Sequence, residues 1–352
     1  MKLWFPEVDI LKATAIVLIV FSHMDNYVSS YELIRLFDQY AALIGLSIFF
    51  FISGFLLSHT DSVISSVKDV KKFYLRKFIR IYPLYWVALA SLVIIFGVLH
   101  INPGRVIPYN FSLENVLLHF FGLQGIFPYT SIQSMWFVGV IVLFYLLYPI
   151  IVYFSKNLFE TFVVSSLIFM VLVILHVFFG LIAPDALAYY PLFISGIFIH
   201  QIVYASKKIG DEHLLKKILF STLILVSAIF LVLVLRKIYD VNLLFLSEIL
   251  LICALISLCI FYLVFTHLFV KTDGKIMVLL SLIAFATYAI YLFQHQFLAV
   301  FTLITDRFIQ NILLQDVIIL TFGFAGAMLF GILIQKIELY FYLKYKSHLL
   351  QN

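Results

Sequence analysis

Apolar runs about as long as a membrane-spanning helix follow one another through almost the whole chain. They lie near residues 8–28, 38–58, 80–100, 134–154, 160–182, 187–205, 218–236, 243–267, 277–304 and 311–336. A helix needs about 20 mainly apolar residues to cross the hydrocarbon core of a bilayer. The sequence therefore predicts an all-α fold, a polytopic transmembrane bundle of about ten spanning helices.

The composition agrees with residence in a lipid bilayer. Of the 352 residues, 64% are hydrophobic and only 12% are charged, whereas roughly 25% are charged in soluble domains. Stretches outside the apolar runs are too short for a separate soluble domain, so we predict one membrane domain over residues 1–340 and a short cytoplasmic tail over 341–352. The first run lacks the cleavage site of a signal peptide and is expected to remain as the first span.

The basic residues predict which side of the membrane each loop occupies. An even number of spans puts both termini on one side. Of the 23 lysines and arginines, Lys12 lies within the first span, and the opposite side holds only Arg35, Arg105, Arg236, Lys237 and Arg307. Cytoplasmic loops carry the excess of basic residues, so both termini are predicted to be cytoplasmic. Loop placement also explains the net charge of +5 without a nucleic-acid partner.

Three ionisable residues interrupt the apolar first span. At 100° per residue, Lys12 and His23 lie about 20° apart around the helix axis, and Asp9 lies about 40° to the other side of His23. Charged groups in a spanning helix normally face a protein interior or a water-filled cavity. The stripe indicates a functional site, with an anchor pair at the headgroups and a structural histidine as the alternative.

A basic segment precedes the third run. In KDVKKFYLRKFIRIYPLYW, residues 68–86, Arg76 and Arg80 are one helical turn apart, Lys77 lies beside them, and Tyr82 and Pro83 fix the entry of the helix. Such a face binds anionic lipid headgroups. It equally suits the phosphates of a nucleotide-like donor, because arginine supplies paired hydrogen bonds.

Polar side chains also gather in the ninth run. Tyr288, Tyr291 and His295 follow helical spacing, and Gln294 lies beside them. Hydrogen bonding between helices explains them as well as a substrate site does. Glu248 in the eighth run is a further candidate for a buried carboxylate.

The segment 101–133 on the outer side contains several glycines and prolines around a short apolar piece. It is either a re-entrant cover over a cavity or a packed loop, and the packed loop is favoured. A glycine-rich phosphate loop, a GxSxG elbow and metal-ligand spacing are absent from the sequence. We therefore expect neither a metal nor a bound cofactor.

Taken together, these motifs resemble acyltransferase family 3, the multi-pass enzymes that O-acylate sugars. The resemblance spans nearly the whole chain, in the family's order. It rests on DILKATAIVLIVFSH (9–23), FFISGFLL (50–57), RKFIRIYPLYW (76–86), SMWFVGVIVLFYLLYP (134–149), YYPLFISGIF (189–198), TYAIYLFQHQ (287–296) and QKIE (335–338).

The resemblance implies a membrane O-acyltransferase that moves an acyl group, usually acetyl from acetyl-CoA, to a hydroxyl of a cell-surface glycan or its lipid-linked precursor. His23 would be the general base, with Lys12 and Asp9 on its motif. A neutral imidazole suits proton removal from an attacking hydroxyl. The co-substrate would be acyl-CoA, and the location would be the plasma membrane.

The resemblance also implies a donor site formed by the basic segment and Tyr82. Trp136, Tyr288, Tyr291, Gln294, His295 and Glu248 are candidates for the cavity or acceptor site. The chain departs from the family in having Lys12 where arginine is common and Gln294 where the late motif usually has histidine.

Geometry sets a condition on this mechanism. His23 lies about 16 Å along the helix from Lys12, so acyl-CoA from the cytoplasm must reach it through a polar tunnel. A transporter or flippase of a glycan or lipid precursor is the main alternative, although no inverted repeat is visible. A structural or sensory membrane protein is a third possibility.

Overall fold

The computed structural model describes residues 5–28, 32–101, 110–127, 132, 135–205, 218, 244–269 and 274–351. Side chains are described for these residues except 32–39, 203–205, 244–250, 269 and 345–351. All statements below concern this part of the chain.

Every regular element in the described part of the chain is helical, as the sequence predicts. The helices are α1 (Pro6–His23), α2 (Glu32–Thr60), α3 (Val67–Leu92), α4 (Leu113–Phe120), α5 (Trp136–Phe154), α6 (Leu158–Phe179), α7 (Pro184–Ile199), α9 (Leu244–Phe269), α10 (Lys275–Phe308), α11 (Ile312–Ile318) and α12 (Phe324–Gln351). A 3₁₀ turn, η1 (Met24–Asn26), follows α1, and π-helical turns η2 (Val93–Val98), η4 (His200–Ala205) and η6 (Ile319–Gly323) extend α3 and α7 and join α11 to α12.

Seven helical segments in the described residues are long and apolar enough to cross a bilayer: Tyr40–Thr60, Val67–Val98, Trp136–Phe154, Leu158–Phe179, Leu251–Leu268, Lys275–Phe308 and Ile312–Lys344. The prediction of ten spans is thus confirmed only in part. α1 has 18 residues but carries Glu7, Asp9 and Lys12, and α7 has only 16 residues. The predicted span 218–236 lies, except for residue 218, outside the described residues.

Local sequence signals set several helix ends. The Ser66 side chain accepts a hydrogen bond from the Asp69 amide, and the Asp69 carboxylate accepts one from the Ser66 amide, which forms a capping box at the start of α3. Asn157 caps α6 through the amide of Glu160. Gly180 ends α6 with a φ of 64°, a conformation in which glycine avoids steric strain. These signals place the α3 basic face at a defined helix start.

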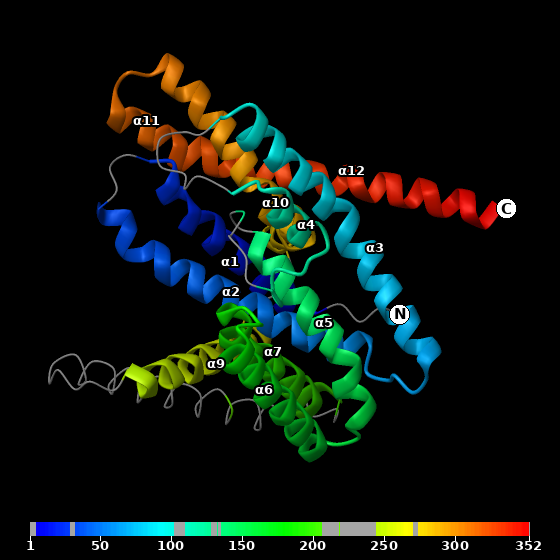
Figure 1. Cartoon of the computed structure of the whole chain (residues 1–352). Coiled ribbons are helices and arrows are strands. Elements are labelled where there is room, and N and C mark those ends of the chain that lie inside the picture. The colour runs from blue at the N-terminus through cyan, green and yellow to red at the C-terminus, as the bar shows by residue number, and fades with distance from the viewer. Residues whose placement is uncertain are drawn as a thin grey trace, which may run out of the picture.

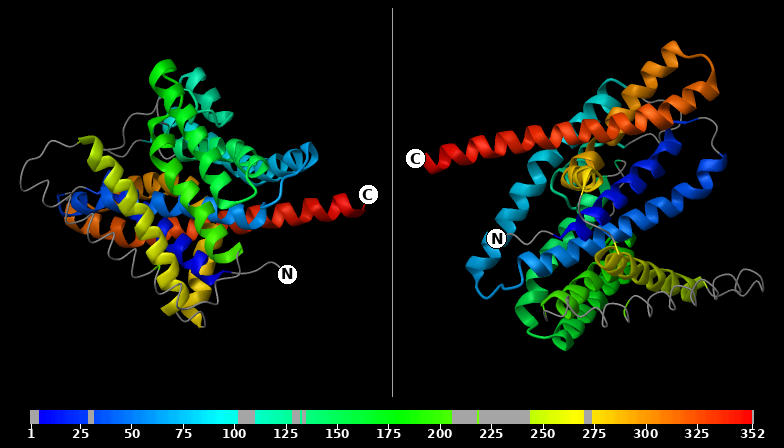
Figure 2. Two further views of the ribbon diagram at one scale, coloured as in Figure 1. Left: turned by 90° about the horizontal axis from the view of Figure 1, so that it is seen from below. Right: turned by 180° about the vertical axis from the view of Figure 1, so that it is seen from behind.

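The central helices lie side by side in the order α12, α10, α1, α2 and α7. α3 and α5 cross this row on one side, where α3 contacts α10 and α5 contacts α7 (Figure 1). α9 packs against α1, α2 and α7. Both views in Figure 2 show α12 projecting away from the rest of the bundle toward the C-terminus. The helix runs without a break through residue 340, the predicted end of the membrane domain.

α2 and α7 approach so closely that backbone touches backbone. A Cβ placed on Gly196 would lie 1.9 Å from the Phe51 carbonyl oxygen, and one on Gly54 would lie 1.9 Å from the Phe193 carbonyl oxygen. Small residues of this kind let helices pack closely within a membrane. The crossing fixes α2, which supplies one wall of the site described below.

The described part of the outer segment is a packed loop built on α4. The Tyr85 hydroxyl donates to the His119 carbonyl at 2.7 Å, and the Gln124 amide donates to the Tyr85 hydroxyl at 3.0 Å and to the Met135 carbonyl at 2.9 Å. Both His119 and Gln124 are fully buried. These bonds tie the loop to α3 and to the start of α5, which agrees with the favoured prediction, while residues 102–109 lie outside the described part.

The α2–α7 crossing makes a prediction about stability. Gly196→Ala should destabilise the protein by about 1–3 kcal/mol or more, because overpacking costs this much even where side chains can yield, and here a backbone oxygen must move. Thermal unfolding in detergent, followed by the loss of monodisperse protein, measures the effect. Gly323→Ala is the matched control, since the nearest atoms to its Cβ would all be side-chain atoms, of Phe301 at 3.2 Å and of Leu298 at 3.5 Å. Equal melting of both variants would contradict the close crossing.

Candidate active site

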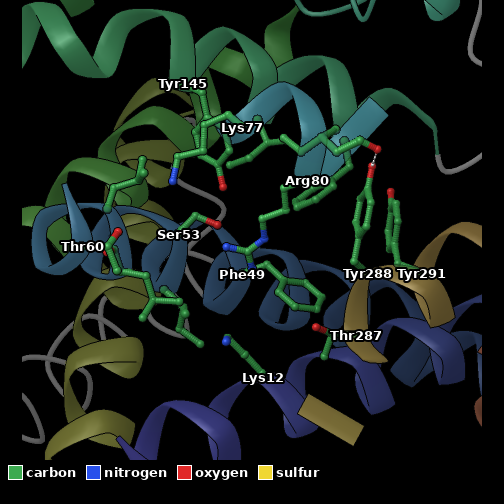
Figure 3. A pocket seen from close by; sticks show the side chains of 16 residues that line it. Lys12, Phe49, Ser53, Thr60, Lys77, Arg80, Tyr145, Thr287, Tyr288 and Tyr291 are labelled. Carbon is green, nitrogen blue, oxygen red and sulfur yellow. Dashed lines mark hydrogen bonds between the residues drawn. The ribbon is translucent and has the colours of Figure 1, made fainter. Parts of the chain in front are cut away.

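A cavity of about 290 Å³ lies between α1, α2, α3, α5 and α10. These five helices come from distant parts of the sequence and all contribute lining residues (Figure 3). The lining consists of Lys12, Phe49, Ile52, Ser53, Leu56, Leu57, Thr60, Lys77, Arg80, Ile81, Phe137, Ile141, Tyr145, Thr287, Tyr288 and Tyr291. We call it the inner cavity.

The inner cavity is positively charged. Lys12, Lys77 and Arg80 line it, and the described lining residues include no acidic side chain, while Asp61 pairs with Lys77 from outside this lining. Figure 3 shows the Lys12 ammonium and the Arg80 guanidinium pointing into the space from α1 and α3. Because like charges in a low-dielectric space repel strongly, this arrangement favours an anionic ligand.

A wider cavity of about 550 Å³ shares Thr60, Lys77 and Arg80 with the inner one. Its other lining residues are Asp61, Arg76, Ile79, Glu338, Leu339 and Tyr342. We call it the mouth. The three shared residues make the two spaces neighbours, so the cationic groups of Lys77 and Arg80 border both cavities.

Asp61 holds two of the predicted basic residues in place. Its buried carboxylate accepts a hydrogen bond from Lys77 Nζ at 3.1 Å and a close ion-pair contact from Arg76. Burial by itself would raise the pKa of Asp61, but Lys77, Thr60 and Arg76 outweigh it and leave the pKa below its ordinary value. The carboxylate is therefore charged and fixes the ammonium of Lys77 at the entrance.

Aromatic residues close the far end of the inner cavity. The rings of Phe137 and Tyr291 lie with centroids 5.0 Å apart. The Tyr288 hydroxyl donates to the Ile81 carbonyl at 3.1 Å and so ties α10 to α3. Tyr291 is almost fully buried, and it forms the last polar position before the next group of buried residues.

His23 lies in that next group, together with Tyr27, Gln294 and His295. Its ring lies close to the Gln294 side chain, and its centroid lies 4.5 Å from that of His295. His295 in turn contacts the Tyr27 hydroxyl through Nδ1 at 2.9 Å. The ends of α1 and α10 thus bring two imidazoles together inside the protein.

His23 does not line the inner cavity. Gln294 follows Tyr291 by three residues, a rise of about 4.5 Å along α10. The two cavities together extend from the mouth to Lys12 and Tyr291, and their lining ends about one helical turn short of the His23 group. The predicted tunnel to His23 stays a prediction.

The structure brings together most of the predicted site residues. Arg76, Lys77 and Arg80 meet at the mouth, and Lys12, Tyr288 and Tyr291 line the inner cavity. Gln294 and His295 lie beside His23. Asp9 lines neither cavity, and the side chain of Glu248 lies outside the described residues.

Two predicted site residues lie outside both cavities. Tyr82, predicted to bind the donor, lines neither cavity, because its hydroxyl donates to the Phe121 carbonyl at 2.8 Å and its ring stacks on Phe78. Trp136, predicted to line the cavity, instead stacks on Tyr189 with ring centroids 5.9 Å apart. Both aromatic rings are used for packing between helices.

Several residues of the cavities carry no signal that we detected in the sequence. Asp61, Ser53, Tyr145, Thr287 and Glu338 each come from a different motif or flank one. Asp61 directly follows α2 and precedes Arg76 of the basic segment by 15 residues. For Asp61, the only indication in the sequence is that this acidic residue lies close to a cationic helix. No cluster of three potential metal ligands occurs among the described residues.

Comparison with known proteins places the chain in a family. A family model described as an acyltransferase domain matches residues 5–336. This range confirms the resemblance to acyltransferase family 3 and contains the whole lining of the inner cavity. No curated protein and no solved structure matches the chain.

The Asp61 ion pairs predict a pH-dependent contribution to stability. Asp61→Asn should cost about 2 kcal/mol near neutral pH, as expected for hydrogen bonds to charged groups. The pKa of Asp61 is lowered by folding, so its carboxylate stabilises the protein above the unfolded pKa of about 3.9. That stability is lost as the pH falls through the folded pKa.

Thermal unfolding at pH 7 and in increasingly acidic buffers should therefore show the gap between wild type and Asp61→Asn closing in acid. Asp306→Asn is the control, because its carboxylate accepts a hydrogen bond from Gln315 that an asparagine oxygen also accepts. A gap that persists unchanged in acid would contradict a charged Asp61.

Proposed function

The chain belongs to acyltransferase family 3, and from that premise we propose that it transfers an acyl group, in the first place acetyl, from acyl-CoA to a hydroxyl of a cell-surface carbohydrate or its lipid-linked precursor. Its long apolar helices make it a membrane protein. One observation carries the proposal: two neighbouring cavities lined by Lys12, Arg76, Lys77 and Arg80, together called the cationic passage, reach to within about one helical turn of the half-buried His23.

The donor is proposed to enter from the cytoplasm. Coenzyme A carries its negative charge on phosphates, and Arg76, Lys77 and Arg80 line the mouth where these phosphates would bind. Arginine binds phosphate through two parallel hydrogen bonds, while lysine acts as a point charge. Asp61 keeps Lys77 in a fixed position, so the site is formed before the donor arrives.

The thioester end of the donor is proposed to lie in the inner cavity. The thin pantetheine arm suits a space lined by Phe49, Phe137 and the tyrosines of α10. Lys12 would face the arm from α1. To meet His23, the thioester must pass the contact between Phe137 and Tyr291, so donor binding is proposed to open this contact.

His23 is proposed as the general base that takes the proton of the acceptor hydroxyl. The oxygen then bonds to the thioester carbon, the carbon–sulfur bond breaks, and the proton passes to the coenzyme A thiolate. A positioned base contributes typically 10²–10⁴-fold in rate. His23 ends α1 on the side away from the mouth, which suits an acceptor arriving from the outer side of the plasma membrane.

His23→Ala should lower acyl transfer by about 10²-fold or more, because the general base is lost. The assay follows thiol release from acetyl-CoA, and radiolabelled acetyl transfer to membrane glycans, in membrane vesicles of the host. Protein abundance in the membrane should stay unchanged. Wild-type transfer by His23→Ala would remove His23 from the mechanism, and no thiol release by the wild-type protein would favour a transporter.

Arg80→Ala should raise the KM for acetyl-CoA by about tenfold or more, since hydrogen bonds to charged groups contribute about 1.5–3 kcal/mol. Arg80→Lys should recover part of the loss because the charge remains. Lys72→Ala is the matched control: this basic residue of α3 is exposed and lines neither cavity. The same KM in the Arg80 and Lys72 variants would contradict phosphate binding at the mouth.

A further inference from the structure

Two imidazoles beyond the inner cavity each have a buried nitrogen without a hydrogen-bond partner in the described part of the protein. These atoms are His23 Nδ1 and His295 Nε2. The two rings lie with centroids 4.5 Å apart and planes 49° apart. Buried polar atoms are nearly always hydrogen-bonded, so two unpartnered nitrogens on neighbouring rings mark a place that a polar group fills.

The Tyr27 hydroxyl contacts two atoms of His295, and one tautomer of the ring satisfies both contacts. The Tyr27 hydroxyl has one hydrogen, and it donates this to the His295 carbonyl at 3.2 Å. The same hydroxyl oxygen lies 2.9 Å from His295 Nδ1. Both contacts are satisfied together only when Nδ1 is protonated and donates to the hydroxyl oxygen. In neutral His295 the Nε2 atom is then a bare acceptor.

The surroundings of the pair supply further polar atoms. The Gln294 amide nitrogen donates to the Tyr291 carbonyl at 3.3 Å, while its Oε1 is buried without a partner in the described residues. His23 is half-buried, although its Nδ1 is inaccessible. A hydroxyl, which both donates and accepts, complements such a set of groups.

We propose that His295 is a second catalytic imidazole of the transfer reaction, whose Nε2 accepts the hydrogen bond of the acceptor hydroxyl and shares with His23 the proton that leaves it. The inference rests on the proposed acyltransferase function. The hydroxyl oxygen bonds to the thioester carbon as the carbon–sulfur bond breaks, and the shared proton passes to the coenzyme A thiolate. When two imidazole rings share one positive charge, the free energy needed to form that charge away from water is smaller.

Two substitutions at position 295 separate proton transfer from a structural role. His295→Asn places an amide nitrogen near the position of Nδ1, so it keeps a donor for Tyr27 but lacks any atom at Nε2. His295→Gln reaches the Nε2 position, so it can hold a hydroxyl but cannot take its proton. We expect kcat to fall about 100-fold in His295→Asn and about tenfold in His295→Gln, within the range for acid–base groups.

The assay is transfer of radiolabelled acetyl from acetyl-CoA to glycans in host membrane vesicles, with kcat and the KM for acetyl-CoA measured separately. The KM should stay within about twofold of wild type, because neither variant alters the cationic passage. Wild-type kcat in His295→Asn would overturn the inference. The wild-type protein and His23→Ala separate the two hypotheses. No acetyl transfer by the wild-type protein overturns the proposed function, whereas an inactive His23→Ala beside a fully active His295→Asn overturns the inference alone.

If the position-295 variants fail to accumulate in the membrane, Tyr27→Phe tests the catalytic role of His295 instead. It removes one oxygen atom and releases the constraint on the His295 tautomer, so kcat should fall about tenfold with normal protein abundance. His176→Gln is the control, because this histidine lies on α6 and contacts only the Ile182 carbonyl among the hydrogen bonds described for it. An unchanged kcat in Tyr27→Phe would overturn the inference.

Discussion

Positive charge inside a bilayer has to be enclosed by protein, and the arrangement of this bundle follows from that requirement. An exposed lysine or arginine at the centre of a spanning helix costs about 2.5–3.5 kcal/mol on insertion scales. Lys12 and Lys77 are only partly exposed because five helices surround the space that they line, and Arg80, which is exposed, borders the same space at the mouth. Asp61 offsets part of the remaining repulsion through Lys77 and Arg76. The close α2–α7 crossing fixes the helix that Asp61 follows.

Polar residues on α10 are divided among three neighbours because successive residues turn around the helix. Tyr288 and Tyr291 line the inner cavity, while His295 lies against His23 and Tyr27. The Gln296 amide donates to the Ala88 carbonyl and to Ser91 of α3. One helix therefore supplies a cavity wall, a partner for the buried histidine and a bond that ties it to α3. Along the axis of α10, the residues that line the inner cavity therefore come first and the residue that contacts His23 follows.

The spacing of residues within single helices predicted much of the site, but it could not predict which residues of different helices contact one another. Spacing along α3 put Arg76 and Arg80 on one face, and spacing along α10 joined Tyr288 to Tyr291. Asp61 and Tyr145 could not be found in this way, because their positions depend on how α2, α3 and α5 cross. The packing of Trp136 and Tyr82 could not be predicted for the same reason, since an aromatic ring serves a cavity or a helix contact equally well until its neighbour is known.

The central claim is that the cationic passage delivers an acyl donor to the His23–His295 pair. A cryo-EM structure with a non-hydrolysable thioether analogue of acetyl-CoA tests it most directly. We expect density for the phosphates beside Arg76, Lys77 and Arg80, and density for the thioether beyond a displaced Tyr291, next to His23. Phosphates bound elsewhere, or an analogue lying across the mouth with the Phe137–Tyr291 contact still closed, would contradict the account.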